Sequence, residues 1–349
     1  MLGVHRIVRL VAVHGTRVRG VSKFYIAGGR QRRRGGWVEE WHRYDRGVIA
    51  ELDSASGQLD VRCEHTTPAD ACALDENPAI LFKAATLQDG VLYACTQTEI
   101  MAYDVPSFRE LWYVSLPCFN DVHHVRPTEN GSLLVVSTGL DLVVEVSTAG
   151  EILNEWNVLG SETWSRFSRD TDYRRVLTTK PHESHPNYVF TLGGHIWATR
   201  LEKRDAVCLT GEGRIAMDRE PPHDGVVRGE RIYFTTVDGH VLEYDVNSKE
   251  LVRDVDLNQF YTLEAGEVSG WCRGIEILGP DLFVVGFSRI RQTTFRQNLR
   301  WLKARTLGTE RVDSLPTRVA AFDLTSTEKI WEYELEDIGL NAVFSIHAV

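Results

Sequence analysis

The sequence predicts an all-β fold, a six-bladed β-propeller built from four-stranded antiparallel blades. Three observations support this prediction. A unit of four short strands recurs along the chain, several third strands of the unit end in the same Asp, and the C-terminal segment matches only the first strand of a unit. We find no helical periodicity of useful length that would oppose the prediction.

Five copies of the unit follow one another, each with a polar-headed strand, a turn, an apolar strand and two further short strands. They cover residues 83–116, 124–158, 187–217, 223–257 and 273–335. In the clearest copy the turn at 129–131 contains Asn130-Gly131, a sequence typical of tight antiparallel connections. Third strands end in Asp104, Asp245 and Asp323.

The two ends of the chain are predicted to build the sixth blade together. Residues 339–346 resemble 185–192, which makes Asn341 the head of an inner strand, but the chain stops before strands two to four. The missing strands are predicted at 23–27, 48–53 and 58–63. This closure leaves no open sheet edge at the seam and makes residues 1–349 one domain. Seven blades are the alternative if residues 1–20 carry another strand.

Polar residues occupy one shared register at the heads of the inner strands. Five of them stand nine positions before a large apolar residue of the second strand, and Asn341 completes the ring. The six positions are Lys83, His124, Asn187, His223, Arg273 and Asn341. An unpaired buried polar group is costly, so a ligand is one candidate for satisfying these side chains at the mouth of the central channel.

Long insertions are predicted on the same face as these polar heads, at about residues 28–47, 160–184 and 288–316. Loops of this length often form lids or binding sites. They are rich in Arg and Trp, namely Arg32, Trp37, Trp164, Arg166, Arg169, Arg174, Arg175, Arg291, Arg296, Arg300 and Trp301. With Lys83 and Arg273, they predict a cationic lining and hence a small anionic ligand, such as a carboxylate, sulfate or phosphate.

Composition limits the classes of function. The 349 residues are 43% hydrophobic and carry a net charge of -10, which argues against nucleic acid as a partner. No apolar run is long enough for a membrane helix, and no signal-peptide core is recognisable, so we expect a cytoplasmic protein without a membrane partner. The six cysteines form no Cys-x-x-Cys pair, which favours reduced thiols.

Three histidines are candidates for nucleophilic or acid–base catalysis: His124, His185 and His223. Cationic neighbours favour the neutral, nucleophilic form of an imidazole, while Lys83, Asn187, Arg273 and Asn341 would bind the substrate. Strand alternation predicts that His124 faces the channel and that His123 packs between blades. No cofactor can be identified from the sequence.

A resemblance supports this chemistry. The segment 121–135 around His124, the His185-x-Asn187 step and the segment 222–225 around His223 resemble repeats of the arylsulfotransferase-like propellers. The resemblance covers about residues 119–275. It implies a six-bladed propeller that transfers a sulfuryl group through a histidine, with His, Asn and Arg binding the sulfate. The chain departs from that family in its long basic insertions and in lacking a recognisable export signal.

Three other interpretations remain open. His124, His185 or Asn187, and His223 could ligate an axial metal, although Lys83 and Arg273 would repel a cation and no carboxylate occupies the register. The propeller could instead be a non-catalytic platform that binds a protein partner through its Arg- and Trp-rich loops. Polar residues on inner strands can also simply bind ordered water in the channel.

Overall fold

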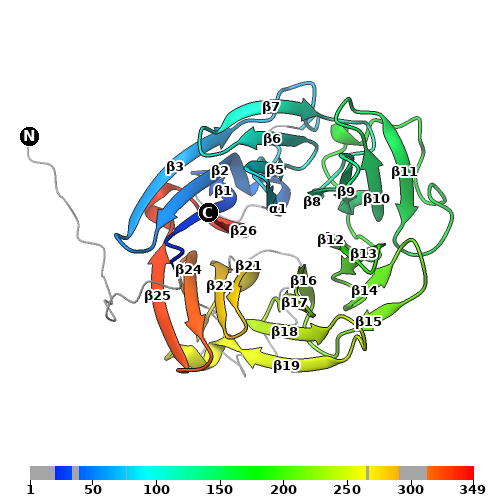
Figure 1. The fold of residues 1–349 in the computed structure, drawn as a ribbon. Coiled ribbons are helices and arrows are strands. Elements are labelled where there is room, and N and C mark those ends of the chain that lie inside the picture. Colours follow the sequence, from blue (N-terminus) through cyan, green and yellow to red (C-terminus); the bar gives the residue numbers. More distant parts are fainter. Residues whose placement is uncertain (1–19, 34–38, 76, 265–266, 291–312) are drawn as a thin grey trace, which may run out of the picture.

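The computed structural model describes residues 20–33, 39–75, 77–264, 267–290 and 313–349. Its strands form six four-stranded antiparallel sheets arranged in a ring, with the first strand of each sheet nearest the axis (Figure 1). The predicted six-bladed propeller is therefore confirmed. Of the segment 1–20, on which the seven-bladed alternative depended, all but Gly20 lies outside the described residues.

The first three blades come from the N-terminal half of the chain, except that the inner strand of the first blade is the last strand of the chain. Each blade is described from its inner to its outer strand. The first blade is β26 (Ala342–Ala348), β1 (Lys23–Gln31), β2 (Tyr44–Asp53) and β3 (Gln58–His65). The second is β4 (Thr86–Gln88), β5 (Val91–Cys95), β6 (Ile100–Asp104) and β7 (Arg109–Val114). The third is β8 (Val122–Pro127), β9 (Leu133–Ser137), β10 (Leu142–Val146) and β11 (Ile152–Asn157).

The remaining blades follow in chain order. The fourth is β12 (Pro186–Leu192), β13 (His195–Arg200), β14 (Asp205–Cys208) and β15 (Arg214–Ala216). The fifth is β16 (Pro222–Arg228), β17 (Arg231–Thr236), β18 (His240–Asp245) and β19 (Leu251–Asp256). The sixth is β21 (Trp271–Gly279), β22 (Leu282–Ser288), β24 (Arg318–Asp323) and β25 (Glu328–Glu334).

Short elements connect or cap these strands. β20 (Glu267–Val268) pairs in parallel with β23 (Asp313–Ser314). The helical turns are α1 (Glu40–Arg43), η1 (Thr138–Leu140), η2 (Tyr173–Arg175), η3 (Leu257–Phe260) and η4 (Glu336–Ile338).

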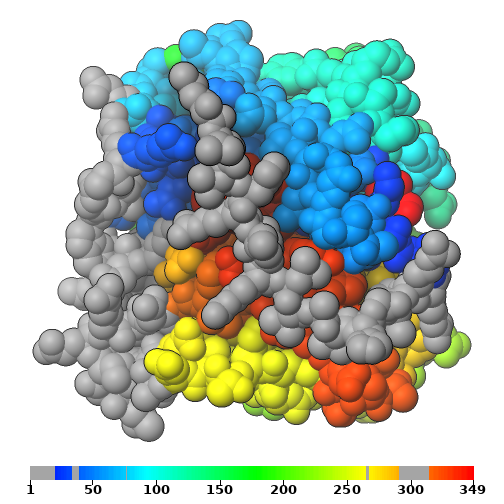
Figure 2. Space-filling view, turned by 90° about the vertical axis from the view of Figure 1, so that its left-hand side faces the viewer, coloured from blue at the N-terminus to red at the C-terminus, as the bar shows by residue number. Residues whose placement is uncertain are grey.

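The ends of the chain close the ring as expected, because β26 pairs antiparallel with β1 from Phe24↔Ala348 to Gly29↔Ala342. N-terminal and C-terminal segments consequently lie against each other on one side of the molecule (Figure 2). Gly28 is required at this seam, since a Cβ there would collide with the backbone oxygen of Ala342. β1 and β2 also extend into the first predicted insertion, so the connection between them covers residues 32–43 and not 28–47.

The recurring Asp at the end of third strands has a structural role. Asp245 Oδ1 accepts the backbone N–H groups of Asn247 and Ser248 at 2.9 and 3.0 Å, and Asp323 Oδ1 accepts that of Thr325 at 2.8 Å. A carboxylate that accepts N–H groups two and three residues further along stabilises the turn into the outer strand. The repeated signature therefore marks a turn and belongs to the scaffold.

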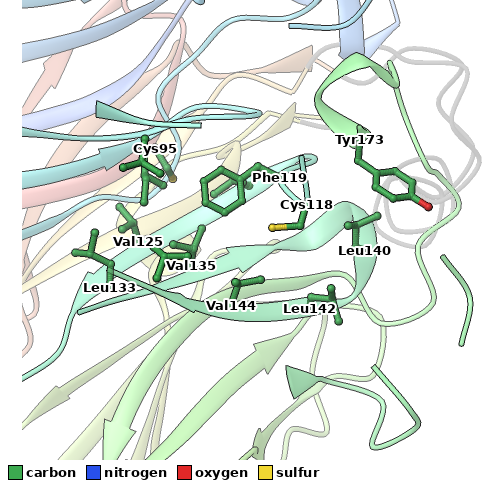
Figure 3. Packing of buried hydrophobic residues seen from close by; sticks show 14 residues of the cluster. Cys95, Cys118, Phe119, Val125, Leu133, Val135, Leu140, Leu142, Val144 and Tyr173 are labelled. Carbon is green, nitrogen blue, oxygen red and sulfur yellow. The ribbon is translucent and has the colours of Figure 1, made fainter. Parts of the chain in front are cut away.

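Neighbouring blades are joined by apolar side chains. Between the second and third blades, Cys95 of β5 packs with Val125, Val135 and Val144 of the third blade in one buried cluster (Figure 3). Phe119, in the connection between the blades, fills the same cluster. This packing keeps the inner strands in fixed positions around the axis.

Two general features of the chain are visible in the described residues. All six cysteines are free thiols, and Cys95, Cys118, Cys208 and Cys272 are buried. No helix among these residues is long and apolar enough to cross a membrane.

Candidate functional site

A cavity of about 430 Å³ lies at the axis, where the inner strands begin. All six blades contribute to its wall, and so does each of the three predicted insertions, through Glu40 and Arg43, through residues 180–182, and through Arg289 and Ile290. Because loops entering the inner strands and loops between second and third strands meet here, the cavity occupies the face on which the polar heads were expected.

Three of the six register positions lie on the cavity wall: Lys83, His223 and Arg273. The others do not. Asn187 is buried beside His223, Asn341 accepts a hydrogen bond from the backbone N–H of Gln31 at 2.8 Å, and His124 is fully buried. His185, which lies outside the shared register, is on the wall. The common spacing of nine residues therefore does not correspond to one common environment.

The assignment of the two adjacent histidines is corrected by a β-bulge. β8 pairs Val122 with Ser137 and His124 with Val136, so His123 is an extra residue without a partner on β9. A bulge breaks the alternation of side chains. His123 consequently reaches the cavity wall, where its ring packs edge-on against His185 with centroids 4.9 Å apart, instead of packing between blades.

His124 points toward the axis but is enclosed by other inner strands. The backbone N–H of Val189 donates to Nδ1 at 3.1 Å, and Thr86 Oγ1 lies 3.1 Å from Nε2. The ring stacks on Tyr188 with centroids 3.7 Å apart. Both nitrogens are thus engaged, and His124 is absent from the cavity wall, which contradicts its expected place at the channel mouth.

Lys83 enters the site in a buried ion pair. Its Nζ lies 2.8 Å from Asp121 Oδ1 and 3.4 Å from His123 Nε2. Burial alone would raise the pKa of Asp121, but Lys83, His123 and Lys180 together hold the pKa of that carboxyl well below its usual value. The positive charge of Lys83 is therefore compensated within the protein.

Arg273 differs from Lys83 in lacking such compensation within the described part of the chain. Its guanidinium carbon lies 4.1 Å from the ring centroid of Phe344 and 5.2 Å from that of Trp271. Among the described residues it makes no hydrogen bond or ion pair, and its buried Nε has no partner. Burial lowers the pKa of Arg273, with Glu40 the largest of the charges that oppose this shift. Arg remains charged at neutral pH, so it brings a positive charge to the site.

His223 holds the aromatic wall in place. Trp271 Nε1 donates to His223 Nε2 at 2.8 Å, and Asn187 Nδ2 lies 2.9 Å from His223 Nδ1. Burial, followed by Arg273, lowers the pKa of His223 well below its ordinary value. With both nitrogens occupied, His223 has no lone pair free for nucleophilic attack, and its role in this geometry is to orient Trp271.

His185 is positioned by Asp141, a residue in the left-handed region with φ 53°. Asp141 Oδ1 accepts the backbone N–H groups of Ser184 and His185 at 3.0 and 3.1 Å. The His185 ring meets His182 through a contact of 3.2 Å between the two Nδ1 atoms, while its Nε2 makes no hydrogen bond among the described residues. Burial and the neighbouring His123 lower the pKa of His185 well below its usual value.

The arginines of the long loops mostly belong to the scaffold. Arg166 pairs with Asp141 at 2.5 Å, Arg169 with Glu155 at 2.5 Å, and Arg174 with Asp172 at 2.7 Å. Arg32 and Arg175 bond to backbone oxygens. None of these five arginines lines the cavity. Trp37, Arg291, Arg296, Arg300 and Trp301 lie outside the described residues, and so do residues 291–312 of the third insertion as a whole.

Sequence reasoning missed three important wall residues: His123, Trp271 and Phe344. Trp271 was accessible in principle, because it stands two residues before Arg273 on the same strand and so shares its face. Phe344 carries no polar signal, and His123 depends on a bulge. Among the described residues, no group of three or more His, Cys, Asp or Glu side chains is arranged to hold a metal ion.

Comparisons with known proteins support the fold. No protein-family model matches the chain, and no curated protein matches it in sequence. A protein of unknown function from Bacteroides caccae is 12% identical with a TM-score of 0.59, over 94% of this chain and 99% of that chain.

Two further structures are more distant. The C-terminal WD40 domain of Sif2 is 8% identical with a TM-score of 0.48, over 92% of this chain and 88% of that chain. A catalytically inactive virginiamycin B lyase from Staphylococcus aureus with quinupristin is 13% identical with a TM-score of 0.42, over 73% of this chain and 70% of that chain. None of the three is described as an arylsulfotransferase, and at 8–13% identity the likeness to these structures is one of fold alone.

Proposed function

We propose that this propeller binds a small anion in its axial cavity, with Arg273 as the principal contact. The observation that carries the proposal is the guanidinium of Arg273 on the cavity wall, which makes no hydrogen bond or ion pair with any described residue. A buried charge without a counter-ion is costly, and an anion that enters the cavity would offset that cost. A cavity of about 430 Å³ lies within the size range typical of small-molecule sites.

The test is a comparison of two arginines on inner strands. Acetate, benzoate, sulfate and phosphate are titrated into the wild-type protein and into two variants, Arg273→Gln and Arg126→Gln, by isothermal titration calorimetry. Arg126 is the matched control, because it lies on β8 and does not line the cavity. We expect saturable binding of at least one anion, weakened tenfold or more in Arg273→Gln and unchanged in Arg126→Gln. Binding that is absent, or equal in all three proteins, would refute the proposal.

A group-transfer reaction is a second candidate function, and one observation favours it. Of the three histidines expected to be catalytic, His185 alone lies on the cavity wall with a ring nitrogen that makes no hydrogen bond among the described residues. Its Nε2 would attack the transferred group of an ester and form an N–sulfur, N–phosphorus or N–acyl bond while the ester oxygen bond breaks. The leaving oxygen departs as an alkoxide or phenolate, which takes up a proton from solvent where its basicity requires one. An acceptor hydroxyl would then take the group and lose its proton to solvent.

Release of p-nitrophenolate from the sulfate, phosphate and acetate esters of p-nitrophenol tests this candidate. Activity should be lost in His185→Gln and retained in His195→Gln, a histidine on β13 away from the cavity. Absence of activity with all three esters, or activity that survives in His185→Gln, would leave binding as the function.

A further inference from the structure

Most of the positive side chains on the cavity wall are paired with carboxylates among the described residues. Four cationic wall residues have carboxylate partners within 3.3 Å: Lys83 with Asp121, Lys180 with Glu40, Arg204 with Glu220 and Arg289 with Glu336. Arg43, a fifth cation on the wall, also has an interaction partner. The four histidines on the wall favour the neutral form at pH 7, because burial lowers the pKa of His123 to about 3, those of His185 and His223 well below their ordinary values, and that of His182 as well.

Arg273 is the cation on the wall that makes no hydrogen bond or ion pair with the described residues, and aromatic rings limit the directions from which a ligand can approach it. Its guanidinium carbon lies 4.1 Å from the ring centroid of Phe344 and 5.2 Å from that of Trp271, so aromatic rings pack against it while its N–H groups lie at its edge. A guanidinium edge matches the two oxygens of a planar carboxylate in a bidentate pair. A dianion would bring a second negative charge toward a wall on which four cations already have carboxylate partners, and would face the carboxylates of Glu40 and Asp121 that act on Arg273.

Beside this single charge, the cavity presents apolar surface. Leu81, Val237, Ile290 and Ala342 line it together with the rings of Trp271 and Phe344. Burial of an aromatic or bulky aliphatic body against such side chains contributes about 25 cal/mol for each Å² removed from water. Acetate or formate would leave most of the cavity unfilled.

We propose that the ligand of the axial cavity is an amphipathic monocarboxylate, in which one carboxylate pairs with Arg273 and an aromatic or bulky aliphatic body fills the apolar wall. This inference rests on the proposed anion-binding function and narrows it to one class of ligand. It differs from the sequence-based expectation, which treated carboxylate, sulfate and phosphate alike.

The test is a matched series titrated calorimetrically into the full-length protein. The series consists of 2-naphthoate, its neutral amide 2-naphthamide, the dianions naphthalene-2,6-dicarboxylate and 2-naphthyl phosphate, and acetate, which lacks the body. We expect 2-naphthoate to bind at least tenfold more tightly than each of the others. In Arg273→Gln the preference for 2-naphthoate over 2-naphthamide should disappear, and in Arg126→Gln it should persist.

The outcomes separate this inference from the function on which it rests. If either dianion binds as tightly as 2-naphthoate, or if acetate does, the monocarboxylate proposal is wrong while anion binding stands. If no member of the series binds but sulfate or phosphate does so in an Arg273-dependent way, the same conclusion holds. If no anion of any kind depends on Arg273, both proposals fail together.

Discussion

Two sections of the propeller axis are built from the same inner strands, but one encloses a cavity and the other is filled by side chains. The cavity is lined by His123, Arg273 and Phe344, whereas the section that we call the packed section contains the buried His124 and Tyr188 and the partly buried Glu276 and His347. β8 supplies a histidine to each, β21 supplies Arg273 and Glu276, and β26 supplies Phe344 and His347. In the packed section His347 lies close enough to His124, and Glu276 to Tyr188, to act on them electrostatically.

The difference shows that residue type does not decide which polar group is available for a ligand. His124 has a partner on each ring nitrogen and an aromatic ring on its face, so it stabilises the structure. Arg273 has aromatic neighbours and no hydrogen-bonding partner among the described residues, so its bonding capacity remains for a ligand. Packing around the side chain separates a structural group from a binding group.

The largest expected effect is on the buried ion pair of the cavity wall. Lys83→Met should lower the free energy of unfolding by about 3–5 kcal/mol, because it leaves the buried Asp121 carboxylate without its partner. Urea unfolding followed by circular dichroism measures this change. Adding Asp121→Asn should restore part of the loss. A loss below about 1 kcal/mol in the single variant would mean that water screens the pair and that its environment is not dry.

Removing the stacked histidine of the packed section should be the next most costly change. His124→Ala should lower the free energy of unfolding by about 3 kcal/mol, since it opens a cavity against Tyr188 and leaves the Val189 N–H without an acceptor. The matched variant Tyr188→Phe keeps the stacking surface and should cost less than about 1 kcal/mol. If the two variants were equally unstable in urea, the hydrogen bonds of His124 would not contribute as argued.

Glu276 should give the packed section a distinct pH dependence. Burial raises the pKa of this carboxyl to about 7, so between about pH 4.5 and 7 the folded protein retains a proton that the unfolded chain has released. The free energy of unfolding therefore falls as pH rises through that window. Glu276→Gln should reduce the loss of stability between pH 5 and pH 8 by about 2 kcal/mol. Unfolding curves with the same pH slope in both proteins would contradict this assignment.

The smallest effect on stability is expected at the cavity histidine. His185→Ala should change the free energy of unfolding by less than about 1 kcal/mol, because the backbone of residue 185 still bonds to Asp141 and the ring faces open volume. The measurement is again urea unfolding, side by side with His124→Ala. A loss as large as that of His124→Ala would remove the distinction between the two sections.

Much of the fold was predictable because it depends on local patterns. Apolar second strands such as β9, turns such as Asn130-Gly131, and Asp residues that bond to the next backbone N–H groups all act within a few residues of one another. The match between residues 339–346 and 185–192 was enough to predict the closure by β26. Three polar residues of the cavity wall were predicted for the same reason, since Lys83, His223 and Arg273 stand at the heads of inner strands.

The sequence by itself determined the number of blades, the closure of the ring, the face that carries the site and three of its charged or polar wall residues. The tertiary structure alone decided that His123 and not His124 lines the cavity, that Lys83 is compensated by Asp121, and that Arg273 packs against two aromatic rings. The physical reason is the distance along the chain between the residues that interact. Periodicity and turns are set by neighbours along the chain, whereas a bulge, an ion-pair partner and a ring contact are set by residues brought together from different blades.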